Sequence, residues 1–125
     1  MRDELLISKL EFIQESVDLI QEWFQDIKQA DDYLATSLGK SHLDATLMRL
    51  QSIGETVKKI SSEHPSLLKK HGSIEWHEII RLREIISHHY EQLSHEIIYS
   101  ICRDNLPALK RAIQAMLAEL KGKPD

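Results

Sequence analysis

Turn-forming residues are scarce in this sequence, which has only 4 glycines and 3 prolines among 125 residues. An all-β sandwich or barrel needs a turn about every 8–12 residues, so the composition argues against that class and favours long helices. No apolar run approaches the roughly 18 residues of a membrane span, so we expect no membrane partner. The length leaves room for one packed core, and we predict a single domain over residues 1–125.

Cysteine is nearly absent as well, since Cys102 is the only one and cannot form an internal disulfide. The first four residues, Met1-Arg2-Asp3-Glu4, are charged and do not resemble a signal peptide. Both features are typical of a reducing compartment, so a cytoplasmic protein is expected. We interpret Cys102 as a buried, unreactive thiol.

Metal-ligand motifs are incomplete. His77 and His95 are each followed by Glu, as in the zinc-protease motif H-E-x-x-H. The fifth position of that motif holds Arg81 in one case and Tyr99 in the other, so the second histidine ligand is missing. One histidine without a partner at this spacing cannot form the site. The sequence therefore predicts neither a metal nor another cofactor.

Charge is unevenly distributed along the chain. The net charge of −4 argues against a non-specific coat for nucleic acid. Residues 1–32 contain three basic and nine acidic side chains, whereas residues 33–125 contain thirteen basic and eleven acidic ones. An acidic, solvated helix face explains the first part, and the mildly basic remainder is compatible with a small phosphate site.

Apolar residues recur every three or four positions, which is the period of an amphipathic helix. We expect helices over residues 2–29, 41–64, 74–92 and 95–103, a short helical turn over 65–72, and a last helix from Asp104 or Asn105 to about 121. The first helix shows the clearest stripe: Leu6, Leu10, Ile13, Val17, Ile20, Phe24 and Ile27. This succession predicts an all-α, up-down bundle of about five helices.

Helix boundaries follow from a few residues. Ser41 resembles an N-cap for the second helix, and Ser73 for the third. Pro65 ends the second helix near His64, because the residue before proline avoids helical geometry. Gly54 occupies the apolar stripe of the second helix, where we predict that it permits close approach of the first helix.

The third long helix contains one anomaly. Arg83 lies between Ile79 and Ile86 on the stripe that should be buried, and Tyr90 follows two turns further along the same face. A charge at such a position must be paired, or must line a cavity or an interface. One interpretation is structural: Arg83 pairs with an acid, and His88 is a cation at the end of the helix.

A functional interpretation comes from the local motif. Arg83, His88 and Tyr90 form the pattern R-x(4)-H-x-Y, which resembles the motif of the HepT-like HEPN family. The resemblance covers nearly the whole chain, through I-G-E at 53–55, a variant of P-W-x-x-I at 75–80 and L-P-x-L at 106–109. One departure is Glu84, where the family usually has Asn; this carboxylate is placed to pair with Arg83 or His88.

The resemblance implies a helical bundle that dimerises through its motif-bearing helices. It also implies a metal-independent endoribonuclease, the toxin of a toxin–antitoxin module, that acts on an RNA substrate. Its implied partner is a nucleotidyltransferase antitoxin that silences it by adenylylation of Tyr90. Higher oligomers with the antitoxin are compatible with this picture.

The residue chemistry agrees with that implication. His88 can act as general acid or base near neutral pH, and the guanidinium of Arg83 suits phosphoryl oxygens. Arg83 and His88 are therefore the predicted catalytic residues, and His89 is interpreted as a neighbour. The alternative is a non-catalytic helical module that binds a nucleotidyltransferase or a nucleotide, with the Arg–His pair structural and Glu84 a sign of lost activity.

Overall fold

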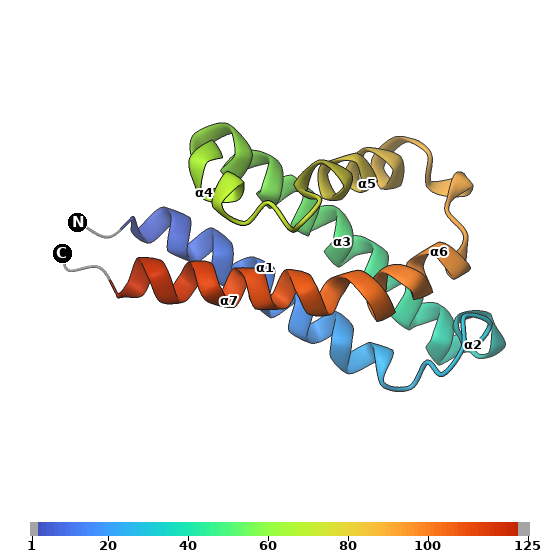
Figure 1. The fold of residues 1–125 in the computed structure, drawn as a ribbon. Helices are drawn as coiled ribbons and strands as arrows, with labels where there is room; N and C mark the ends of the chain where they lie inside the picture. The colour runs from blue at the N-terminus through green and yellow to red at the C-terminus, as the bar shows by residue number, and fades with distance from the viewer. Residues whose placement is uncertain (1–2, 123–125) are drawn as a thin grey trace.

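Helices form all the regular structure of residues 3–122, the part of the chain that the computed structural model describes. The longer helices α1 (Glu4–Phe24), α3 (Ser37–Glu63), α5 (Trp76–His88) and α7 (Leu106–Lys121) run alternately in opposite directions (Figure 1). Between them lie α2 (Asp32–Ala35), α4 (Pro65–Lys70), the 3-10 turn η1 (Tyr90–Gln92), α6 (His95–Ser100) and the π-helical turn η2 (Ile101–Asn105). The predicted all-α, up-down bundle is confirmed.

The core lies between α1, α3 and α7, because α1 packs against both other helices. Its apolar side chains include the predicted stripe of α1, of which Leu10, Ile13, Val17 and Ile20 are fully buried. Burying one such side chain stabilises the fold by about 1.5–3 kcal/mol. Helix α5 packs mainly on α3, and Ile86 is its one buried residue. No helix of residues 3–122 is both long and apolar enough to cross a membrane.

The first helix ends earlier than the stripe predicts. It stops at Phe24 and not at residue 29, although Ile27 is still buried. The carboxylate of Asp32 accepts hydrogen bonds from the backbone N–H groups of Lys28 and Gln29, at 2.8 and 3.2 Å. These bonds replace helical ones, so the chain turns while its apolar side chain remains in the core.

The second long helix begins at Ser37, and the predicted start at Ser41 is wrong. Thr36 is the N-cap, since its hydroxyl accepts a hydrogen bond from the N–H of Gly39 at 2.9 Å. A Cβ at Gly39 would lie 2.3 Å from the carbonyl oxygen of Asp32. Glycine is therefore required here for α2 to pack closely on the first turn of α3. The predicted end near His64 is confirmed.

The helix expected over 74–92 is shorter than predicted. It begins at Trp76, with Glu75 and not Ser73 at the N-cap position, and ends at His88. The indole N–H of Trp76 is within hydrogen-bond distance, 3.1 Å, of the carbonyl oxygens of both Leu68 and His71. This side chain fixes the start of α5 against the preceding turn.

The last two predicted helices are continuous. Ser94 caps α6, since its hydroxyl accepts a hydrogen bond from the N–H of Ile97. Asn105 occupies the N-cap position of α7, as predicted, but its backbone is helical and its side chain makes no capping bond. The π-helical turn η2 joins α6 directly to α7 instead. A π-helical turn contains an extra residue, and it lies just before Pro107, which cannot donate a helical hydrogen bond.

Candidate active site

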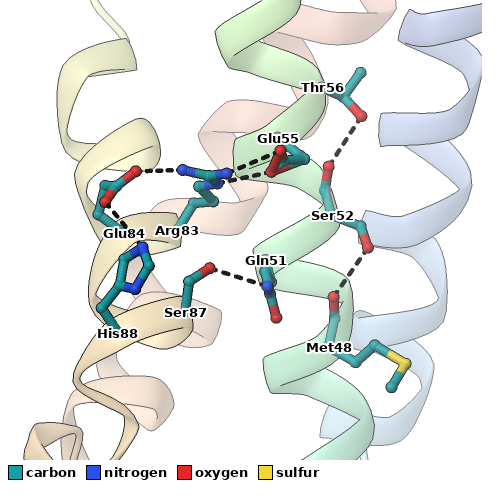
Figure 2. Close-up of polar contacts among 9 residues, drawn as sticks. All are labelled: Met48, Gln51, Ser52, Glu55, Thr56, Arg83, Glu84, Ser87 and His88. Carbon is teal, nitrogen blue, oxygen red and sulfur yellow. Dashed lines mark hydrogen bonds and ion pairs between the residues drawn. The ribbon is translucent and has the colours of Figure 1, made fainter.

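Arg83 lies between two carboxylates. Its Nε and Nη2 atoms donate to Glu55 of α3 at 2.7 and 2.9 Å, and its Nη1 atom donates to Glu84 (Figure 2). The side chain of Arg83 is 18% exposed. The sequence-based requirement that this charge be paired is confirmed. Two parallel bonds to one carboxylate are the most directional pairing available to a guanidinium.

Glu84 contacts both predicted catalytic residues. One of its oxygens accepts from Arg83, and the other lies 3.6 Å from Nε2 of His88, one turn further along α5. Figure 2 shows Glu84 beside Arg83 and His88 on the outer side of α5. The expected pairing of Glu84 with either Arg83 or His88 therefore occurs with both.

His88 is the last residue of α5, and its side chain is 65% exposed. The neighbouring His89 is also exposed but lies outside the helix, as its C-cap. Ser87 is held to α3 because its hydroxyl accepts a hydrogen bond from the amide of Gln51 at 3.0 Å. This bond and the Arg83–Glu55 pair fix the end of α5 on α3.

Gly54 explains how close the two helices come. A Cβ at Gly54 would lie 2.3 Å from the Cβ of Arg83 and 3.0 Å from the carbonyl oxygen of Ile79. The predicted close approach of a neighbouring helix is correct, but the neighbour is α5 and not the first helix. Because Glu55 directly follows Gly54, the same approach brings its carboxylate to Arg83.

The electrostatics follow from these contacts. Hydrogen bonding to Arg83 holds the pKa of the Glu55 carboxyl below its ordinary value. Hydrogen bonding to Glu55 raises the pKa of Arg83 above its already high value. Both groups are therefore ionised at neutral pH. Two carboxylates, those of Glu55 and Glu84, thus contact the single positive charge of Arg83.

Tyr90 is displaced from the position that the spacing predicts. Because α5 ends at His88, Tyr90 begins the 3-10 turn and does not continue the apolar stripe of the helix. Its side chain is 53% exposed, and its hydroxyl lies 3.5 Å from a carboxylate oxygen of Asp44 on α3. Tyr90 thus lies beside the N-terminal part of α3, two residues after His88.

His88 and Glu84 are exposed at the site, with 65% and 47% of their side chains accessible. Two hollows occur elsewhere: one of about 400 Å³ along α1, and one of about 310 Å³ where α3 meets α4. Neither is lined by Arg83 or His88. Among residues 3–122, no three His, Cys, Asp or Glu side chains are grouped as metal ligands. Cys102 is buried, and burial raises the pKa of its thiol to about 11.

Sequence reasoning missed the role of Glu55. The I-G-E segment contains Glu55, but its partner Arg83 is 28 positions away in the sequence. A pair of this kind is created by helix packing, and no local pattern reveals it. The nearest signal was the requirement that Arg83 have an acidic partner.

Comparison with protein families identifies the class to which the chain belongs. The family model described as "Ribonuclease HepT-like" matches residues 13–116. The chain belongs to the HepT-like ribonuclease family.

Named relatives agree with this assignment. "Probable ribonuclease HepT" of Thermococcus cleftensis is 30% identical over 101 residues, which cover 81% of this chain and 86% of that protein. A "Putative RNase" of Methanocaldococcus jannaschii is 27% identical over 81 residues, covering 65% of this chain and 64% of that protein. Another, of Caldanaerobacter subterraneus, is 29% identical over 77 residues, covering 62% and 66%. No solved structure matches the chain significantly.

Proposed function

We propose that this protein is an endoribonuclease that cleaves RNA without a metal ion, with His88 and Arg83 as its catalytic residues. The observation that carries the proposal is the arrangement at the end of α5. An exposed histidine and a paired arginine of the same helix are connected there through one carboxylate. Membership of a ribonuclease family supports the class of reaction.

The reaction suits these side chains. A histidine acting as general base takes the proton of a ribose 2′-OH, whose oxygen then bonds to the adjacent phosphorus. The bond from phosphorus to the 5′-oxygen breaks, and a general acid protonates that oxygen. Arg83 stabilises the charge that develops on the phosphoryl oxygens. The products are a 2′,3′-cyclic phosphate and a 5′-hydroxyl.

A homodimer would complete the site, because each chain supplies one His88 for two proton-transfer steps. His88 is 65% exposed in the single chain, whereas catalytic sites are generally concave and enclosed. Apolar side chains are exposed close by: Tyr90 at 53% and Met48, one turn along α3 from Asp44, at 70%. Light scattering should give twice the chain mass of 14.5 kDa at micromolar concentration. A monomer would contradict the composite site.

We further propose that the protein is the toxin of a toxin–antitoxin module and that a nucleotidyltransferase partner adenylylates Tyr90. Among the three tyrosines, Tyr90 has the exposed side chain. Tyr33 is 1% exposed, and the hydroxyl of Tyr99 donates to the carbonyl of Lys28 at 3.0 Å. Mass spectrometry after co-expression with the partner should locate AMP on Tyr90, and AMP on another tyrosine would contradict this assignment.

The catalytic assignment is tested with matched histidine variants. His88→Ala should lower the cleavage rate of an RNA oligonucleotide about 10²–10⁴-fold, whereas His89→Ala should cleave within a few-fold of the wild type. Arg83→Lys keeps the charge but loses the bidentate pairing, and a loss of roughly 10²–10³-fold is expected. Cleavage should persist in EDTA and leave a 2′,3′-cyclic phosphate end. Loss of activity in His89→Ala alone would shift the motif register, and loss in EDTA would refute the mechanism.

A second candidate function rests on the contacts of Arg83. Because Glu55 and Glu84 occupy the guanidinium on two sides, Arg83 is also suited to a structural role. In that case the protein is a non-catalytic helical module that binds the transferase or a nucleotide. The purified wild-type protein would then leave RNA intact at every pH and still form a complex with the partner.

A further inference from the structure

The carboxylate of Glu84 lies between the two side chains of the proposed catalytic pair. One oxygen accepts from Nη1 of Arg83, and the other is 3.6 Å from Nε2 of His88. Glu55 takes the opposite edge of the guanidinium, through Nε and Nη2. Figure 2 shows the two carboxylates on opposite sides of the guanidinium. The bond to Glu84 is exposed and the bonds to Glu55 are partly buried, so Glu84 covers the more accessible edge of Arg83.

These contacts are of the kind that a phosphate would make. An RNA phosphate presents two non-bridging oxygens, which share one negative charge and can accept from a guanidinium and from an imidazole at the same time. The carboxylate of Glu84 presents the same two acceptors from within the chain. An RNA phosphate that binds between Arg83 and His88 must therefore displace Glu84 or be repelled by it.

We propose that Glu84 is an internal competitor for the phosphate of the RNA substrate, so that binding requires its carboxylate to turn away from Arg83 and His88. The side chain of Glu84 is 47% exposed, so it can move into water without disturbing the core. Exposed ion pairs contribute little to stability, so this movement requires little free energy. The inference rests on the proposed function for the identity of the ligand, but its test does not require cleavage.

The experiment measures binding of a fluorescent RNA oligonucleotide that is 2′-O-methylated throughout and so cannot be cleaved by 2′-OH attack. Glu84→Gln removes the charge and keeps the size of the side chain. Glu78→Gln is the matched control, because Glu78 is on α5, is exposed and is paired only weakly, at 3.9 Å, with Arg81. It lies six residues, about 9 Å of helix rise, from Glu84.

Removing the charge of Glu84 should raise the affinity for RNA far more than removing the charge of Glu78. Repulsion between two unit charges about 4 Å apart in bulk water corresponds to about fivefold in affinity. Glu84→Gln should therefore bind the oligonucleotide at least about fivefold more tightly than Glu78→Gln in 50 mM salt. The difference should shrink in 500 mM salt, where exposed charges are screened. Glu84→Asn gives the same comparison if the first variant folds poorly by circular dichroism.

The results separate this inference from the proposed function. Equal affinity of the Glu84 and Glu78 variants, or no binding by any of the proteins, would overturn the competition. A tighter Glu84→Gln variant supports it even if no version of the protein cleaves RNA, an outcome that would refute the ribonuclease proposal alone. A Glu84→Gln variant with lower kcat and no gain in affinity would overturn it by showing that Glu84 positions His88 instead.

Discussion

Replacing Gly54 by alanine tests the packing on which the site depends. The new methyl group would lie 2.3 Å from the Cβ of Arg83 and 3.0 Å from the carbonyl oxygen of Ile79. Carbon atoms in contact are normally about 3.5–4.0 Å apart. Neither neighbour can swing aside, because one is a β-carbon and the other is backbone, so α5 must move away from α3 by more than about 1 Å.

The expected magnitude combines two opposing effects. Overpacking of this kind costs typically 1–3 kcal/mol, whereas alanine in place of a mid-helix glycine returns about 1 kcal/mol. The 2.3 Å contact places the overpacking cost in the upper half of that range. We therefore expect a net loss of about 1–2 kcal/mol in the free energy of unfolding for Gly54→Ala, and more for Gly54→Leu. At roughly 4 °C per kcal/mol for a chain of this size, the melting temperature should fall by about 4–8 °C.

Thermal unfolding followed by circular dichroism measures this effect, with Gly72→Ala as the control. A Cβ at Gly72 would lie 3.4 Å from the nearest neighbour, the carbonyl oxygen of Lys69, which is ordinary contact. That variant should unfold close to the wild-type temperature. A Gly54→Ala protein as stable as the wild type would refute the reasoning, since it would mean that α3 and α5 are not held together at this point.

Three further predictions concern charge, reactivity and capping. Arg83 lowers the pKa of Glu55, so this pair stabilises the fold above the ordinary Glu pKa of about 4.3, and the stabilisation is lost as the pH falls through the lowered value. The difference in unfolding free energy between the wild type and Glu55→Gln, measured in urea, should therefore shrink from pH 7 to pH 3. An equal difference at both pH values would contradict the pairing. Iodoacetamide at pH 8 should modify Cys102 roughly 100-fold more slowly in the native protein than in urea, because the thiol is buried and its pKa is raised to about 11. Equal rates of modification would place the thiol at the surface. Ser94→Ala should cost about 1 kcal/mol in urea unfolding, through loss of the N-cap bond to Ile97, and no change would show that this cap is dispensable.

Apolar periodicity predicts which helices exist, because each stripe must face the core. It does not predict where the helices end. Asp32 ends α1 through bonds to backbone groups several residues away, and Thr36 starts α3 before its apolar stripe begins. Local side-chain to backbone bonds of this kind compete with the helix, and they occur between residues that the stripe does not include.

The candidate site shows the same division between local and packed features. Arg83 and His88 were identified from one short motif, and the expected contact of Glu84 with them follows from neighbouring positions on one helix. The partner Glu55 was not assigned, because it reaches Arg83 only through the packing of α5 on Gly54. Spacing alone predicts Tyr90 on the helix, because it does not show that α5 ends at His88.

The end of α5 also determines how far Tyr90 can move. Tyr90 follows His88 by two residues, so its Cα atom stays within about 7 Å of the Cα of His88 in any conformation of the chain. On the other side, six residues connect His88 to α6, whose helix continues through η2 into α7. Residues 89–94 therefore form a short connection between two helices. A group attached to Tyr90 stays close to His88 in any conformation of that connection.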